Sequence, residues 1–368
     1  MRTLLVGAAL GGILVSSVAT AAHGAGEPHT LATRGQVTAL AADGDRAALI
    51  VRLPYDPSGD GIFFDCASVV SWEPMHRSVV RLQRPCGPGS DVSLRESTQA
   101  VALAGTRVAW LHFGGGNTQE AVLETATLAR PRPVWLAYAA SYEGGDGDFV
   151  RDPVGDGALL AFTVERRCDA DAELNEGPGA ENQCPPGRRS GYIVAATLWR
   201  MGGRGNCPVG FPRNRACTRV ASADGELTAL AVDDGRIVAR TETGLSLLTA
   251  RGTVLQEFDV SASSAALSGN RLAVRTADAI EIYNTGSGRQ TARLPAARQL
   301  KLQDLDRDIL VTAAGKTVTL RNLSNGRTSR IRAGGTALAQ LERPGLFVAG
   351  GRRVTFTPMR DVLHRLND

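Results

Sequence analysis

The sequence predicts an all-β fold in which seven four-stranded units form one closed ring. The first observation is a recurring phrase, in which a small-residue segment containing Leu leads into a tight turn and then into Arg and an apolar run. Clear copies occupy residues 102–110, 229–239 and 266–274, and looser copies begin at Ala39, around Val154, at Leu302 and at Ala337. The second observation is regular spacing, because the last four copies begin 37, 36 and 35 residues apart, at Ala229, Ala266, Leu302 and Ala337.

The third observation concerns the segments around the turns, which are too short for helices. Each apolar run after a turn spans about four to eight residues and is rich in Val, Ile and Leu, which is typical of buried strands. The turns contain Gly, Asp or Asn, which tolerate the backbone angles of a tight hairpin. A second hairpin follows in most units, for example in residues 280–294 and 318–331. Each unit is therefore predicted to be a four-stranded antiparallel meander.

Units of this kind are typical of β-propeller blades, which repeat every 35–50 residues or so. One blade cannot bury both of its faces, so stacking around a ring builds the core. We predict a single propeller of seven blades, with six or eight blades, a β-sandwich or two small β domains as alternatives. The even spacing argues against the last two. Residues 29–33 are expected to supply the outer strand of the last blade, and residues 361–366 are the competing candidate.

Residues 1–25 have the features of a secretory signal peptide, and residues 26–368 form the predicted propeller domain. Arg2 precedes an apolar stretch at 4–18, and small residues offer a cleavage site between about Ala21 and Ala25. The alternative is an uncleaved N-terminal anchor, for which the apolar run is short. We expect a secreted or extracytoplasmic mature chain without a transmembrane span.

The charge distribution argues against nucleic-acid binding. Removal of Arg2 lowers the formal net charge from +4 to +3. The basic residues are all Arg except Lys301 and Lys316, and they are scattered along the chain, whereas a nucleic-acid-binding protein concentrates them on one face. We expect a monomer that binds no nucleic acid.

Six cysteines lie between residues 66 and 217, an even number that suits an oxidising compartment. Their positions in the hairpins favour pairing in sequence order, with each disulfide closing a loop worth about 3 kcal/mol in the chain-entropy model. A metal site is the alternative, but no Cys-x-x-Cys pair and no neighbouring His supports it. The predicted disulfides are Cys66–Cys86, Cys168–Cys184 and Cys207–Cys217.

Acidic residues gather in the loops predicted between blades 2 and 3 and inside the Cys168–Cys184 loop. The best cluster, Asp146, Asp148 and Asp152, is a candidate calcium site, because Ca²⁺ takes about six to eight oxygen ligands from flexible groups. It does not match an EF-hand loop, and a solvated acidic loop is the alternative. No other cofactor is expected.

A second candidate site is the Cys207–Cys217 loop, which combines basic and aromatic residues. Phe211, Arg213 and Arg215 are predicted to bind a partner, since interface cores favour Arg and rigid aromatic side chains. The alternative is an ordinary disulfide-held surface loop.

The four tryptophans are interpreted as structural. Trp72 and Trp199 end third strands, in the position that Tyr283 occupies in blade 5, which indicates packing between blades. Trp110 and Trp135 lie within strand patterns and are expected in the core or the channel.

Local enzyme motifs are absent from the sequence. The histidines form no metal-binding pair, and there is no Gly-x-Ser-x-Gly elbow or phosphate-binding loop. A central channel could still bring together residues that are distant in sequence.

The hairpins at residues 282–289 and 320–327 and the phrase at 266–274 resemble those of the WD40, YVTN and TolB-like β-propellers, especially small exported bacterial members. The resemblance covers nearly the whole mature chain, although the Gly-His and Trp-Asp marks of eukaryotic WD40 repeats are absent. It implies a rigid interaction platform, while some propellers are lactonases, lyases or quinone-dependent dehydrogenases.

The first functional hypothesis is therefore an exported, non-enzymatic propeller that binds a protein or cell-envelope ligand through the insertion loops of blades 1 and 3. The second is an enzyme acting on a small substrate or glycan at the channel mouth, assisted by calcium, which predicts that acidic residues meet at the channel. The third is a purely structural envelope protein. Fold alone does not decide among them.

Overall fold

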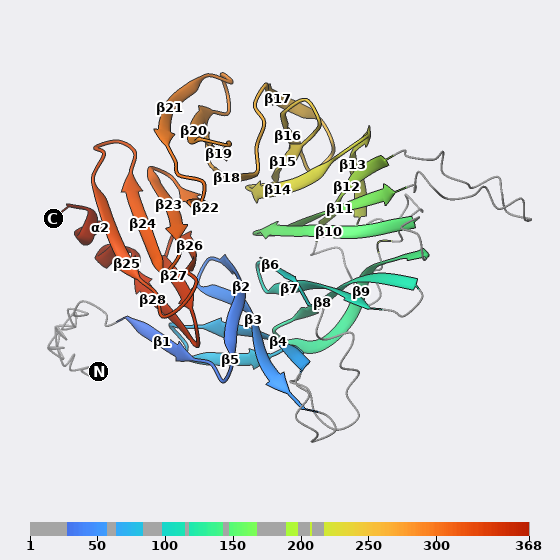
Figure 1. Cartoon of the computed structure of the whole chain (residues 1–368), viewed down its shortest axis with the longest axis horizontal. Coiled ribbons are helices and arrows are strands. Elements are labelled where there is room, and N and C mark those ends of the chain that lie inside the picture. Colours follow the sequence, from blue (N-terminus) through green and yellow to red (C-terminus); the bar gives the residue numbers. More distant parts are fainter. Residues whose placement is uncertain are drawn as a thin grey trace, which may run out of the picture.

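The computed structural model of the chain describes residues 28–56, 64–83, 98–114, 118–142, 147–167, 189–197, 207 and 217–367. Within these ranges the chain forms seven four-stranded antiparallel blades around a central axis (Figure 1). The predicted all-β, seven-bladed propeller is confirmed. No helix in these ranges is long and apolar enough to cross a membrane.

The strands of each blade follow one another in chain order from the axis outward. Blade 1 consists of β2 (Gln36–Asp43), β3 (Arg46–Tyr55), β4 (Phe64–Glu73) and β5 (Ser78–Arg81). Blade 2 consists of β6 (Ala100–Ala104), β7 (Arg107–Gly114), β8 (Thr118–Thr127) and β9 (Arg130–Tyr142). Blade 3 consists of β10 (Gly147–Asp156), β11 (Leu159–Arg167), β12 (Arg189–Thr197) and β13 (Cys217–Asp224).

Blades 4, 5 and 6 are the compact ones. Blade 4 consists of β14 (Thr228–Asp233), β15 (Arg236–Arg240), β16 (Leu245–Thr249) and β17 (Val254–Phe258). Blade 5 consists of β18 (Ser264–Ser268), β19 (Arg271–Arg275), β20 (Ala279–Asn284) and β21 (Gln290–Pro295). Blade 6 consists of β22 (Lys301–Asp306), β23 (Ile309–Ala314), β24 (Thr317–Asn322) and β25 (Thr328–Arg332).

Blade 7 is built from both ends of the described chain. Its first three strands are β26 (Leu338–Glu342), β27 (Gly345–Gly350) and β28 (Arg353–Pro358), and its outer strand is β1 (His29–Ala32), which pairs antiparallel with β28. The predicted N-terminal closing strand is therefore correct. The competing segment forms the helix α2 (Met359–Asn367) instead, and buries Val362 and Leu366 against blades 6 and 7.

The hydrophobic core lies between the blades rather than at the axis. Each of the seven apolar clusters among the described residues joins two neighbouring blades, and together they run around the ring. Small side chains dominate, such as the fully buried Ala47, Ala48 and Ala273. Close packing of neighbouring sheets therefore stabilises the fold, as stacking of repeats requires.

The aromatic residues at the ends of the third strands pack against the preceding blade. Trp72 contacts Phe347 of blade 7 edge to face, with ring centroids 6.1 Å apart. Tyr283 contacts Phe258 of blade 4 in the same way at 5.3 Å. The predicted inter-blade role of these two residues is confirmed, and Trp199 lies outside the described residues.

The prediction for the two strand tryptophans is half correct. Trp110 is fully buried, and its indole Nε1 donates to Glu124 Oε2 at 2.9 Å. Trp135 is 53% exposed, so its expected place in the core or channel is wrong. The reason is an irregularity in β9, where the register shifts between the pairs Leu123–Ala137 and Glu124–Trp135. The extra residue, Leu136, changes the alternation of faces along the strand.

Removal of residues 28–33 is expected to lower the free energy of unfolding by about 2–5 kcal/mol, because β28 loses its ladder hydrogen bonds and the packing of Leu31. Denaturant unfolding of this truncation should be compared with a chain that begins at Pro28. An unchanged midpoint would contradict closure of the ring by β1.

Candidate functional site

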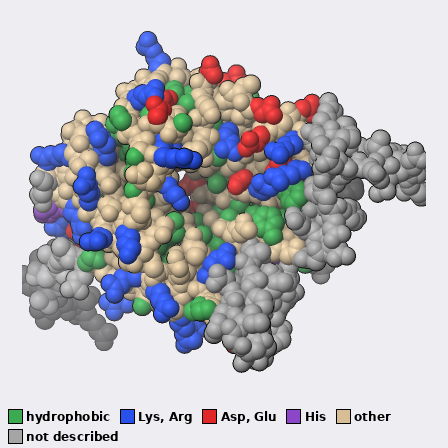
Figure 2. Space-filling view, viewed as in Figure 1, with side chains coloured by type: hydrophobic (Ala, Val, Ile, Leu, Met, Phe, Trp, Pro, Cys, Tyr) green, Lys and Arg blue, Asp and Glu red, His purple; other side chains and the backbone are tan. Residues whose placement is uncertain are grey.

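The inner strands of all seven blades surround the central channel, which opens as a hollow in the middle of the ring (Figure 2). The channel encloses about 220 Å³ and is lined mainly by Ala, Val and Leu along most of its length. Its polar groups gather at the end where the inner strands finish.

At that end, five of the seven inner strands finish with a carboxylate. These residues are Asp43, Asp156, Asp233, Asp306 and Glu342, whereas blades 2 and 5 finish with Ala104 and Ser268. Acidic residues therefore do meet at the channel, although they come from the inner hairpins and not from the predicted acidic loops. Asp304 lies two residues before Asp306 in β22 and lines the same cavity.

These carboxylates link each blade to the next one. Asp156 Oδ2 accepts a hydrogen bond from Asp234 N at 2.9 Å, and Asp233 Oδ2 accepts one from Gly269 N at 3.0 Å. Glu342 Oε2 accepts from Gly44 N at 3.1 Å, which joins blade 7 to blade 1. Each bond satisfies a backbone donor in the first turn of the neighbouring blade.

The two blades without a terminal carboxylate are linked by other means. The side chain of Ala104 cannot accept a hydrogen bond. Asp43 Oδ2 instead accepts hydrogen bonds from both Gly105 N at 2.5 Å and Gly157 N at 2.7 Å. In blade 5, Ser268 Oγ accepts from Arg307 N at 3.0 Å. The acidic ring is thus occupied with structural hydrogen bonds. Within the described residues, no group of three or more His, Cys, Asp or Glu side chains could hold a metal ion.

Burial raises the pKa of several of these carboxyl groups. The pKa of Glu342 is raised to about 9, first by burial and then by the neighbouring Asp304 charge. Burial also raises the pKa of Asp304 to about 7, although the N–H groups of Leu341 and Leu305 favour its charged form. Desolvation disfavours the charged carboxylate in both cases.

Arginines make the corresponding links at the opposite end of the channel. Arg52 Nη2 donates to Thr98 O at 2.6 Å, and Arg240 Nη1 donates to Ala262 O at 3.3 Å. Arg275 Nε donates to Leu300 O at 2.9 Å. Each bond runs from a second strand to the connection that enters the next blade. Some of the arginines that appear scattered in the sequence therefore recur at one position of the fold.

Of the three predicted calcium ligands, the structure describes two, and these two lie apart. Asp146 lies outside the described residues. Asp148 Oδ1 pairs with Arg166 Nε at 2.9 Å, and Asp152 lies four residues further along β10, about 13 Å away on an extended strand. Burial raises the pKa of Asp152, against the opposing effects of Arg151 and Arg240. A calcium site here stays a prediction.

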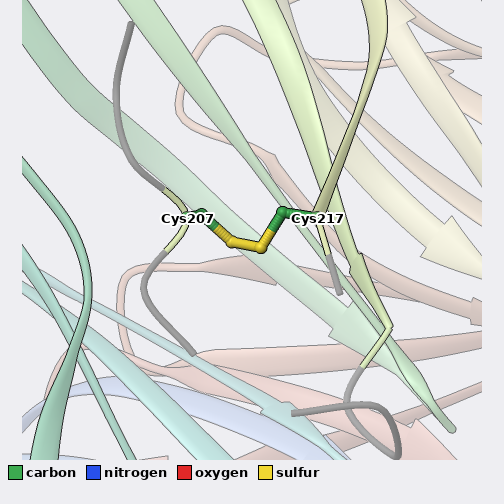
Figure 3. Close-up of a disulfide and its surroundings, with 2 residues drawn as sticks. All are labelled: Cys207 and Cys217. Atoms are coloured by element: carbon green, nitrogen blue, oxygen red, sulfur yellow. A yellow bond between two sulfur atoms is a disulfide. The ribbon is translucent and has the colours of Figure 1, made fainter. Parts of the chain in front are cut away.

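The Cys207–Cys217 disulfide anchors one of the predicted loops at the junction of blades 2 and 3 (Figure 3). The Cα atoms of the two cysteines are 5.7 Å apart. Cys66 is also disulfide-bonded. Cys86, Cys168 and Cys184, and the predicted binding residues Phe211, Arg213 and Arg215, lie outside the described residues.

Cys207 joins the disulfide to the outer strand of blade 2. Its backbone N–H donates to Leu136 O at 2.5 Å, and its side chain is buried in the apolar cluster shared by blades 2 and 3. The loop anchored at Cys207 therefore starts directly beside β9.

Next to this contact, β9 exposes a group of apolar and basic side chains. Trp135 and Tyr138 stack with centroids 5.5 Å apart and an interplanar angle of 11°. They are 53% and 38% exposed, and Val134 is 37% exposed. Arg130 and Arg132 precede them and are also exposed. We call Arg130, Arg132, Val134, Trp135 and Tyr138 the β9 surface.

Sequence analysis missed the β9 surface and the particular residues that form the acidic channel end, for different reasons. The register shift at Leu136 interrupts the two-residue alternation of β9, so the sequence does not indicate which of its side chains are exposed. The acidic residues, in contrast, stand directly before the turn in five copies of the recurring phrase, and an alignment of those copies would have found them.

Replacement of Glu342 by Gln is expected to raise the free energy of unfolding at pH 9 by about 1–2 kcal/mol. The unfolded side chain ionises near its ordinary pKa of 4.5, whereas the folded one ionises near 9, so the native chain loses stability as pH rises between these values. The Gln amide oxygen can still accept from Gly44 N. Thermal unfolding from pH 4 to 9 should show a difference that grows with pH. Asp278→Asn is the control, because Arg293 lowers the pKa of this exposed carboxyl, and an equal gain there would contradict the account.

No protein-family model matches the chain. No curated protein matches it either. Among solved structures, a chain of the mitotic checkpoint complex has a TM-score of 0.53 at 12% identity, over 97% of this chain and 99% of that one. Saccharomyces cerevisiae Sqt1 has a TM-score of 0.47 at 11% identity over 89% and 97% of the two chains. The Neurospora crassa Pan2 WD40 domain has a TM-score of 0.45 at 11% identity over 88% and 90%. The chain thus has a seven-bladed, WD40-like propeller fold.

Proposed function

We propose that the protein is an exported, non-enzymatic propeller that binds a protein or cell-envelope ligand, and that the β9 surface forms part of its binding site. The observation that carries this proposal is the stacked, solvent-exposed pair of Trp135 and Tyr138 beside the Cys207–Cys217 disulfide. Export rests on the signal-like composition of residues 1–25.

The composition of the β9 surface suits a binding site. Trp, Tyr and Arg are the residue types most enriched among those that dominate binding energy at interfaces. The two rings present a flat apolar area, and Arg130 and Arg132 add charge at its border. An exposed aromatic pair leaves apolar area in water, which burial against a ligand would remove.

The surrounding contacts hold the aromatic pair in place before any ligand binds. Tyr138 Oη donates to Glu120 Oε1 at 2.9 Å on the neighbouring strand β8. Leu136 between the two rings is fully buried, and its carbonyl accepts the hydrogen bond from Cys207. A preorganised surface loses less conformational entropy on binding.

The prolines of β9 indicate which kind of contact the ligand makes. Pro131 and Pro133 lie in the outer strand and have no backbone N–H. A partner strand could therefore form only an incomplete ladder along this edge. The β9 surface is suited to recognition through side chains rather than to strand addition.

The insertion loops of blades 1 and 3 remain part of the proposal. The loop between Cys207 and Cys217 starts and ends at this junction, so a ligand on the β9 surface would also be within its reach. Proteins with WD40-like folds generally serve as protein-binding platforms, and the similar chain described above belongs to a multiprotein complex.

The double variant Trp135→Ala, Tyr138→Ala is expected to bind the ligand about 30-fold more weakly or worse. Truncation of such anchors typically costs at least about 2 kcal/mol of binding free energy. The mature chain should be used as bait against the envelope and secreted fractions of the producing cell, with quantitative crosslinking and mass spectrometry. The captured ligand is then titrated against each variant.

The matched control is Val254→Ala, Leu255→Ala, which truncates another exposed apolar pair on the outer strand of blade 4. Both variants should unfold at the temperature of the parent chain. Equal binding by the parent and the β9 variant would sink the proposed site.

A further inference from the structure

A second cavity, of about 530 Å³, lies between blades 5 and 6 at the arginine-linked end of the channel. It is lined by the loop after β19, by the connection entering blade 6 and by the first residues of β18 and β22. Since β22 runs from Lys301 at this cavity to Asp306 in the acidic ring, the two sites lie at opposite ends of the same strand. Figure 2 shows basic side chains beside the central hollow.

The lining of this cavity is basic and contains no carboxylate. Its charged residues are Arg275, Arg298 and Lys301, and its other members are hydroxyl, amide or apolar side chains. Arg298 and Lys301 are exposed, and neither has an ion pair among the described residues. The nearby Asp278 is paired with Arg293, whose Nη2 lies 2.7 Å from Asp278 Oδ2. This acid therefore contributes little negative charge to the cavity.

The charge of Arg275 has no counterion in the described part of the chain. The side chain is 5% exposed, and its guanidinium donates to carbonyl oxygens only, those of Thr276, Ala279, Ala296, Ala297 and Leu300. These bonds satisfy its donors but leave its full positive charge beneath the cavity. A buried charge of this kind favours an anion nearby.

Comparison with blade 4 shows what blade 5 lacks. Arg240 occupies the position of Arg275, because it pairs with Thr228 as Arg275 pairs with Ser264. Arg240 forms an ion pair with Glu226, two residues before Thr228. The corresponding residue before Ser264 is Ala262, which carries no charge. The fold thus has a place for a neutralising carboxylate, and in blade 5 the sequence does not supply one.

We propose that this cavity binds a small multivalent anion bearing carboxylate or phosphate groups. The ammonium of Lys301, the guanidinium of Arg298 and the hydroxyl of Ser264 would contact its oxygens, and the charge of Arg275 would act from below. Leu300 and Leu302 offer apolar contacts to the carbon skeleton of a ligand. The volume is within the usual range for small-molecule sites, about 300–1,000 Å³.

Isothermal titration calorimetry of the mature chain with citrate and with inorganic pyrophosphate tests this proposal and separates the two oxyanion classes. We expect saturable binding of at least one of these probes at one site per chain. The variant Arg298→Gln, Lys301→Gln should weaken it by about tenfold or more, and because both side chains are exposed, the variant should keep the parent unfolding temperature.

The matched control is Arg327→Gln, Arg330→Gln, which also removes two positive charges, but from exposed positions of blade 6 outside the cavity. It should bind the probe within about twofold of the parent chain, since distant surface charges are screened. Absence of saturable binding by the parent, or equal weakening in both variants, would overturn the proposal.

Discussion

The ring depends on contacts between blades, because the strands of each blade are hydrogen-bonded almost entirely to one another. Among the described strands, ladder pairing crosses from one blade to the next only at Ser141 and Gly147, which join blades 2 and 3. Elsewhere neighbouring blades are held by apolar layers and by polar links. Some of these links lie along the inner strands, where Ala339 N donates to Gln303 Oε1, and others lie at the two ends of the inner hairpins. Carboxylates accept from the next turn at one end, and arginines donate to the next connection at the other. Loss of one link therefore weakens the interface with the neighbouring blade, as in other repeat folds.

This arrangement separates the parts that hold the ring from the parts that are free to bind. Most of the acidic residues of the channel already accept backbone hydrogen bonds, and burial raises the pKa of Asp304 and Glu342. They are therefore poorly suited to binding a metal ion. The outer strand β9 and the basic cavity between blades 5 and 6 differ, because aromatic and basic side chains there are exposed to solvent.

Most of the fold could be predicted from the sequence because it repeats. The spacing of the last four copies, the turn residues and the third-strand aromatics Trp72 and Tyr283 all follow from positions that recur in several blades. Trp135 could not be placed, since the extra residue Leu136 reverses the face of the strand locally. The basic cavity combines residues from two blades with the buried Arg275, and only the three-dimensional contacts reveal that this charge has no counterion.

The central claim is that a rigid ring presents the β9 surface to a ligand. Hydrogen–deuterium exchange of the mature chain, with and without its captured ligand, tests it most directly. The account predicts new protection concentrated in residues 130–138 and around Cys207, with the inner strands unchanged. Protection confined to other blades, with residues 130–138 exchanging as in the free chain, would contradict it.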